Sequence, residues 1–109
     1  MNFLEETETD LKDINKTWKD VDYITCVGYK YISKNYNIPI DKFIKISKKL
    51  TGSINYGDHG EYLKIVFKDN TWLERVYTDN DTPYWLHIKK PVRGEKAKVK
   101  DLYNLITGH

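Results

Sequence analysis

The chain has a single cysteine, a single alanine and only two arginines among its 109 residues. The lone Cys26 excludes an internal disulfide and a zinc site built from several thiolates. No apolar run approaches the roughly 18 residues of a membrane-spanning helix. Residues 1–22 are acidic and contain neither the basic nor the apolar region of a signal peptide. We therefore expect a cytoplasmic protein that does not associate with a membrane and keeps Cys26 as a core thiol.

The charged residues are unevenly distributed, although the net charge is only +2. Residues 1–22 hold three lysines and seven acidic residues, whereas residues 89–109 hold six basic and two acidic residues. Residues 23–68 are again basic, and residues 69–88 are again acidic. Such segregation can steer a charged partner. Alternatively, the acidic and basic segments lie against each other within the fold.

The length supports one hydrophobic core and is too short for two. Nine tyrosines, three tryptophans and three phenylalanines supply much of the apolar area available for burial. We expect a single domain over residues 1–109, with an N-terminal helix in residues 1–20 and an α+β body in residues 21–109.

The first third of the chain predicts a helix followed by a strand. Apolar residues recur at helical spacing over residues 3–19, and acidic residues crowd the first turns. Residues 21–33 alternate in the manner of a strand, although helical spacing is also present there. Gly28 predicts a bend or a short hairpin in this strand.

A short middle helix is predicted over residues 42–50. Asn37-Ile38-Pro39 breaks the strand pattern, and Asp41 is a suitable N-cap. The apolar positions would face inward, and four lysines would stand on the outer face: Lys42, Lys45, Lys48 and Lys49. Residues 53–60 have the glycine-rich composition of a loop.

The strongest local pattern predicts a three-stranded antiparallel meander over about residues 62–89. Alternating residues 63–68 lead into a tight turn at Asp69-Asn70, and strands follow at residues 72–77 and 84–89. A final short helix is predicted from Val99 to Ile106. The fold class is therefore α+β, an antiparallel sheet with N-terminal, middle and C-terminal short helices. We expect the meander to bury one face and leave the other open.

One stretch resembles a group of small phage and prophage proteins of low-GC bacteria. It runs from Ile65 to Arg75, through the motif Trp-Leu-Glu-Arg, and ends in a tryptophan-containing strand followed by Lys89-Lys90-Pro91. The chain departs from that group at Asn70, where a glycine is usual, and in a longer second turn. The resemblance implies an origin in a phage or mobile element, and it carries no activity.

Few residues point to catalysis. No glycine-rich phosphate loop or nucleophile elbow is present, and three dispersed histidines with one cysteine make a poor zinc set. The best catalytic candidate is a metal-dependent nuclease. It would use Asp58, His59 and Glu61, supported by Glu74, Arg75 and His87. We favour a protein without catalytic residues, bound metal or cofactor.

Two binding functions remain. Lysines with interspersed tyrosines suggest a small nucleic-acid-binding regulator. A meander with an open face carrying Trp, Tyr and Arg suggests a protein-binding surface. The favoured hypothesis combines this second reading with the resemblance: a phage-type inhibitor that binds a host defence protein or ribonucleoprotein complex in the cytoplasm of the host cell, as anti-CRISPR proteins do. A homodimer is a further option. The predicted contact residues are Trp72, Arg75, Tyr77, Trp85, Lys42, Lys45 and Lys49.

Overall fold

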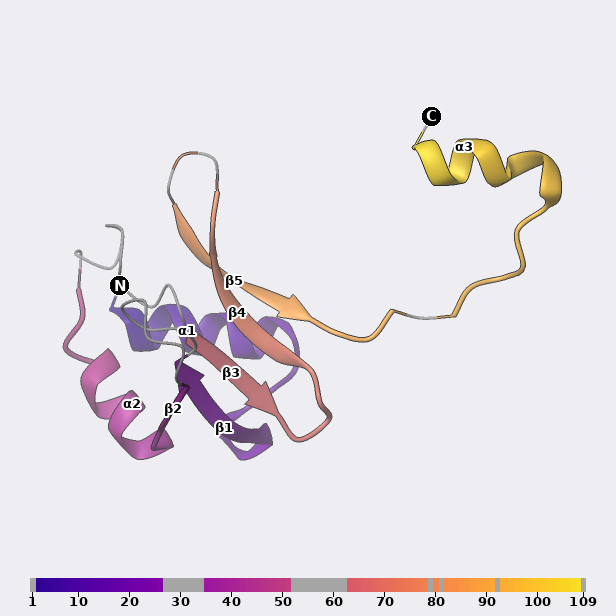
Figure 1. Cartoon of the computed structure of the whole chain (residues 1–109). Helices are drawn as coiled ribbons and strands as arrows, with labels where there is room; N and C mark the ends of the chain where they lie inside the picture. Colours follow the sequence, from indigo (N-terminus) through magenta and orange to yellow (C-terminus); the bar gives the residue numbers. More distant parts are fainter. Residues whose placement is uncertain are drawn as a thin grey trace.

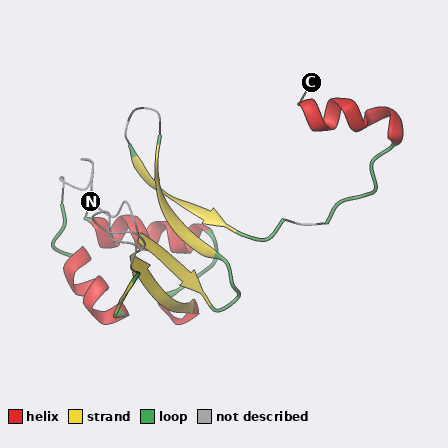
Figure 2. Cartoon of the chain, viewed as in Figure 1, coloured by secondary structure: helices red, strands yellow, loops and turns green. Residues whose placement is uncertain are grey.

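The computed structural model describes residues 2–26, 35–51, 63–78, 80, 82–91 and 93–108 (Figures 1 and 2). In chain order its elements, with η for a 3₁₀-helical turn, are α1 (Phe3–Asp13), η1 (Trp18–Asp20), β1 (Val21–Cys26), β2 (Tyr36–Ile38), α2 (Ile40–Ser47), β3 (Leu63–Phe67), β4 (Trp72–Tyr77), β5 (Pro83–Ile88), η4 (Val99–Asp101) and α3 (Leu102–Thr107). The strands form one antiparallel sheet in the order β2-β1-β3-β4-β5. The predicted α+β class and the meander are confirmed. The predicted loop 53–60 lies outside the described residues.

Helix α1 begins at a capping box. The Glu5 N–H donates to Asn2 Oδ1 at 2.8 Å, and the Asn2 N–H donates to Glu5 Oε1 at 3.2 Å. Both donors would otherwise be unpaired at a helix start. The helix ends at Asp13, and the prediction of a helix to residue 19 is wrong. Asn15 has a left-handed φ of 57°, which an α-helix cannot continue through, so Trp18 lies on the separate turn η1.

The strand predicted after this helix is confirmed over β1, and residues 27–34 with Gly28 lie outside the described part. Strand β2 pairs antiparallel with β1, with Ile24 opposite Ile38. A strand therefore occupies Tyr36–Ile38, where the sequence predicted a break. The break comes at Pro39, because proline has no N–H to donate to a sheet.

Helix α2 begins at Ile40 and ends at Ser47, earlier than predicted. Asp41 lies inside the first turn and makes no side-chain cap, so its predicted role as the N-cap is wrong. The predicted faces are confirmed: Phe43 and Ser47 are buried, and the four lysines are exposed. Phe43 contacts the Phe3 ring at 5.9 Å and the Trp18 ring at 6.0 Å, so α2 joins the same core as α1.

The turn between β3 and β4 is a three-residue hairpin loop. The Asn70 N–H donates to the Phe67 carbonyl at 3.1 Å, and the Phe67 N–H donates to the Thr71 carbonyl at 2.8 Å. Asn70 has a φ of 68°. This is a turn closed by one left-handed residue, an arrangement whose twist suits antiparallel strands. The predicted position of the turn is confirmed. Of the predicted pair Asp69-Asn70, Asn70 has a positive φ and Asp69 does not.

Helix α1 packs across one face of the sheet, which we call the inner face (Figure 1). The Phe3 ring stacks on Trp85 at 5.7 Å, and Trp85 Nε1 donates to Thr7 Oγ1 at 3.0 Å. The buried core consists of Phe3, Leu11, Val21, Ile24, Phe43, Ile65, Phe67, Leu73 and Trp85. It draws on α1, α2 and four of the five strands, so the N-terminal helix is part of the core.

Residues 89–91 and 93–108, which we call the arm, are extended and end in η4 and α3, and Figure 1 shows α3 standing away from the sheet. Every described residue of the arm is exposed. The predicted C-terminal helix is present, yet its apolar side chains are uncovered, with Ile106 82 % and Tyr103 74 % exposed. None of the described helices is long and apolar enough to cross a membrane.

Candidate protein-binding surface

The face of the sheet opposite α1, which we call the outer face, carries rows of aromatic and aliphatic side chains. Residues directly opposite each other in an antiparallel pair point to the same face. One row therefore runs through Tyr23, Val66, Trp72 and Ile88, and Val76 with Tyr84 forms another. Between them lies a mixed row: Thr25, Lys64, Glu74 and Leu86.

The outer face is partly exposed at its apolar positions. Tyr23 is 44 % exposed, Tyr84 41 % and Leu86 40 %. The other members of the apolar rows, Val66, Trp72, Val76 and Ile88, are half-buried. Aromatic residues beside aliphatic ones are typical of the centre of protein–protein interfaces. Covering apolar surface of this kind with a partner lowers the free energy of the system.

A charged pair contacts Trp72, the tryptophan of the outer face. Lys64 Nζ lies 3.2 Å from Glu74 Oε1, and Trp72 Nε1 donates to the same carboxylate oxygen at 3.3 Å. The Lys64 ammonium also lies 5.8 Å from the centre of the Trp72 ring. The indole N–H is thereby satisfied within the chain, and the ring is held in one orientation. A preorganised aromatic side chain loses little entropy on binding.

Two predicted contact residues lie on the other face of the sheet. Arg75 is 3 % exposed and Trp85 is 6 % exposed, and they face each other across β4 and β5. Their predicted exposure is wrong, because the odd-numbered positions of β4 and β5 point towards α1. The register pairs Trp72 with Ile88, so the two tryptophans lie on opposite faces.

Arg75 is instead enclosed by the core. Its guanidinium carbon lies 4.9 Å from the centre of the Phe3 ring and 5.1 Å from that of the Trp85 ring. Nη2 lies 2.9 Å from Glu6 Oε2, an ion pair whose angle does not make a hydrogen bond. Two aromatic faces and one carboxylate compensate part of the cost of burying this charge.

The remaining predicted contacts do not form one surface with Trp72. Tyr77 is half-buried on the inner side at the end of β4. Lys42, Lys45 and Lys49 are exposed on and beside α2, whose Phe43 packs into the inner layer. The lysines therefore belong to a different side of the molecule from the outer face.

The nuclease set is not assembled in the described part of the chain. Asp58, His59 and Glu61 lie outside the described residues. Glu74 lies on the outer face, whereas His87 lies on the inner face opposite Leu73. Within the described ranges, no group of three or more His, Cys, Asp or Glu residues is placed to hold a metal ion.

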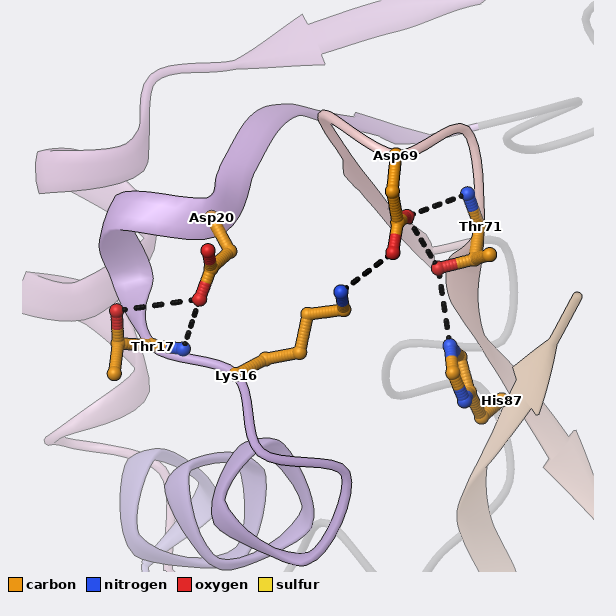
Figure 3. A network of polar contacts seen from close by, with 6 residues as sticks. All are labelled: Lys16, Thr17, Asp20, Asp69, Thr71 and His87. Atoms are coloured by element: carbon orange, nitrogen blue, oxygen red, sulfur yellow. Dashed lines mark hydrogen bonds and ion pairs between the residues drawn. The ribbon is translucent and has the colours of Figure 1, made fainter.

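A polar network ties the end of α1 to the β3–β4 turn (Figure 3). Lys16 Nζ donates to Asp69 Oδ2 at 2.5 Å, and Asp69 Oδ1 accepts from the Thr71 N–H at 2.9 Å and the Thr71 hydroxyl at 2.6 Å. These bonds, with that from Lys16 foremost, hold the pKa of Asp69 well below its ordinary range. Lys16 also lies 5.2 Å from the centre of the Phe67 ring.

His87 extends this network on the inner side of the sheet. Its Nε2 lies 3.0 Å from Thr71 Oγ1, whose own proton goes to Asp69 (Figure 3). Nε2 is therefore the donor and carries the proton. Burial, followed by the positive charges of Lys89 and Lys16, lowers the pKa of His87. A neutral histidine in this position serves to hold the turn against β5, and we assign it a structural role.

A separate opening of about 470 Å³ lies beside the end of α1. It is lined by Glu8, Leu11, Lys12, Asn15, Lys16, Thr17 and Trp18. The Trp18 indole N–H donates to Glu8 Oε2 at 2.8 Å, so these two lining groups are paired with each other. The lining contains neither a histidine nor a cysteine, and we assign no chemistry to it. Cys26 is half-buried on β1, and burial raises the pKa of its thiol, as fits an unreactive side chain.

Most residues of the outer face were not predicted from the sequence. Tyr23, Val76, Tyr84, Leu86 and Ile88 were not among the predicted contacts. The alternation of β4 and β5 contained the signal, but only the register decides which alternating set faces the helix. No family model, curated protein or solved structure matches the chain.

Proposed function

We propose that the chain is a non-enzymatic protein that binds another protein through the outer face of β3, β4 and β5. The observation that supports this function is the set of apolar rows on that face, with Tyr84 and Leu86 about two-fifths exposed around an oriented Trp72. Tryptophan and tyrosine are enriched among the few residues that supply most of the binding energy in protein interfaces.

In its specific form, the proposal is that the partner is a host defence protein or ribonucleoprotein complex and that binding inhibits it, in the manner of anti-CRISPR proteins. This form rests on the resemblance of the Ile65–Arg75 stretch to small phage proteins. The outer face adds a surface through which such an inhibitor would act.

The experiment that tests binding places a photo-crosslinking benzophenone amino acid at position 84, on the outer face, or at position 46, on α2. Ile46 is 57 % exposed and serves as the matched control, because it is apolar and lies on a different side of the molecule. We expect the probe at position 84 to cross-link one host protein or complex, and Leu86→Asp to abolish the product. Equal cross-linking from both positions would contradict the proposal.

The inhibitory form is tested by plasmid interference in a bacterium with an active CRISPR system. We expect the wild-type chain to restore transformation by the targeted plasmid, Leu86→Asp to lose this effect and Ile46→Asp to keep it. An equal effect of the two variants, or none from the wild type in strains covering the main CRISPR types, would contradict inhibition and leave the cross-linking result to decide binding.

Nucleic-acid binding is the second candidate, because the α2 lysines and the basic residues of the arm are exposed. A gel shift with single-stranded and duplex DNA distinguishes it. Binding that weakens steeply with salt and is lost in Lys42→Glu/Lys45→Glu, but not in Leu86→Asp, would favour the regulator.

A further inference from the structure

The C-terminal arm exposes apolar surface that the body of the same chain leaves uncovered. Val99, Leu102, Tyr103, Leu105 and Ile106 of η4 and α3 are 41–85 % exposed. The six-residue helix α3 is far shorter than the roughly 12–15 residues at which an isolated helix becomes marginally stable in water. This helix therefore gains stability when another surface covers its apolar side chains.

The stem of the arm, residues 89–98, is strongly basic. It carries Lys89, Lys90, Arg93, Lys96 and Lys98 against the single acidic residue Glu95. All of its described residues are exposed. Ten extended residues reach up to about 33 Å, twice the roughly 16 Å length of an eleven-residue helix such as α1. The stem is thus long enough to lie along a complete side of that helix.

One side of α1, which we call the acidic flank, has the opposite charge. Glu6, Asp10 and Asp13 follow each other at spacings of four and three residues, so they share one side of the helix. Glu6 pairs with Arg75, whereas no ion pair joins Asp10 or Asp13 to a cation among the described residues. Burial and the charges of Glu6 and Asp13 raise the pKa of Asp10, and Arg75 opposes this only in part. A further cation on this flank would relieve the repulsion.

We propose that the basic arm of one chain docks along the acidic flank of a second copy, and reciprocally, so that the protein forms an arm-exchanged homodimer. Figure 1 shows the arm leading away from its own body, which favours a second copy as the acceptor. A twofold dimer contains the contact twice, so each arm needs to supply only half of the roughly 1,600 Å² that a standard interface buries. The outer face takes no part in this contact, so the dimer goes beyond the proposed function and does not depend on it.

The test is a charge swap between two full-length variants, measured by sedimentation equilibrium at low ionic strength. Lys96→Glu/Lys98→Glu lowers the net charge of the stem from +4 to zero and makes residues 95–98 acidic, and Asp10→Lys/Asp13→Lys makes the flank basic. We expect a wild-type dimer that weakens with salt and a dissociation constant at least about tenfold higher for each variant alone. An equimolar mixture restores the dimer, because the acidic residues 95–98 of one stem then meet the basic flank and the unchanged basic stem meets the unchanged acidic flank.

The matched control is Lys42→Glu/Lys45→Glu, which changes the same charge on α2 and leaves the dimer intact. If Asp10→Lys prevents folding, as circular dichroism will show, Asp10→Asn/Asp13→Lys replaces it with the same expectation. A wild-type chain that stays monomeric at every concentration, including one whose arm folds back on its own flank, overturns the proposal. So does a mixture of folded variants that remains monomeric.

Discussion

The indole Nε1 of Trp85 donates a hydrogen bond to Thr7 Oγ1 at 3.0 Å, and joins residues 78 positions apart in the chain. The Thr7 hydroxyl in turn donates to the Phe3 carbonyl at 2.8 Å. Thr7 is fully buried and Trp85 is 6 % exposed, so water cannot replace either bond. A single hydroxyl therefore satisfies the one polar group of the largest core side chain.

Thr7→Val should lower the free energy of unfolding by about 1–3 kcal/mol, because it leaves the buried indole N–H without an acceptor while keeping the side-chain shape. Urea denaturation measures this loss. Thr9→Val is the matched control, since the Thr9 hydroxyl makes the same bond to Glu5 on the exposed side. It should change stability by no more than about 0.5 kcal/mol. Equal losses for both variants would contradict the assigned role of the Trp85 bond.

Glu6→Gln should cost about 2 kcal/mol, because it removes the counter-charge of the buried Arg75 guanidinium. The value lies below the 3–5 kcal/mol typical of fully buried pairs, since the Glu6 side chain is 26 % exposed. Arg75→Met keeps an elongated apolar side chain between the two rings and removes the buried charge, so we expect it to cost less than Glu6→Gln. Thermal unfolding of Glu6→Gln and Arg75→Met tests which of the two variants loses more stability. Glu95→Gln on the exposed arm is the control. A larger loss for Arg75→Met would show that the ring contacts outweigh the buried charge.

Asn70→Ala should lower the free energy of unfolding by about 1 kcal/mol, because a Cβ-bearing residue without a short polar side chain is strained at a φ of 68°. Asn70→Gly relieves that strain and should leave the protein at least as stable as the wild type. Lys68→Ala, in the same turn at a negative φ, is the control. Chemical denaturation of the three variants would refute the turn geometry if alanine were tolerated as well as glycine.

Stability should fall as the pH drops below about 6.5, the ordinary pKa of histidine. The folded state lowers the pKa of His87, so the unfolded chain binds the proton more tightly. The stabilisation by neutral His87 is complete above the pKa of the histidine in the unfolded chain. It is lost as the pH falls towards and below the lower pKa of His87 in the folded state. His87→Gln should remove this slope in a series of thermal melts. An unchanged slope in the variant would place its origin elsewhere.

A second decline should begin at more acidic pH. The folded state lowers the pKa of Asp69 from an ordinary value near 3.8, so its contribution persists above that value and is lost below it. Asp69→Asn should weaken the acid transition in circular dichroism while leaving the His87 slope in place. If Asp69→Asn altered only the slope near pH 6, the assignment of the two windows would be wrong.

Local patterns in the sequence predicted the helices and strands better than they predicted which residues are exposed. The alternation of β3, β4 and β5 and the turn at Asn70 are short-range features, and they were predicted correctly. The end of α1 was not predicted correctly, because the residue type of Asn15 does not by itself indicate a left-handed backbone conformation. The identity of the buried tryptophan was missed because it depends on which face α1 covers, and that is decided by contacts such as Phe3 with Trp85.

The same long-range dependence explains the errors at the candidate site. Arginine is a residue type typical of exposed contact surfaces, and the burial of Arg75 depends on Glu6 and Phe3 of a distant helix and on Trp85 of the next strand. The network of Lys16, Asp69 and His87 joins three separate segments and had no signature in any one of them (Figure 3).

The contact of the first helix with the last strand has a consequence for the order of events during synthesis. Phe3 and Thr7 are synthesised before their partner Trp85, which lies 78 positions after Thr7. The native core therefore cannot form until Trp85 has been synthesised. Until then the apolar side of α1 remains uncovered.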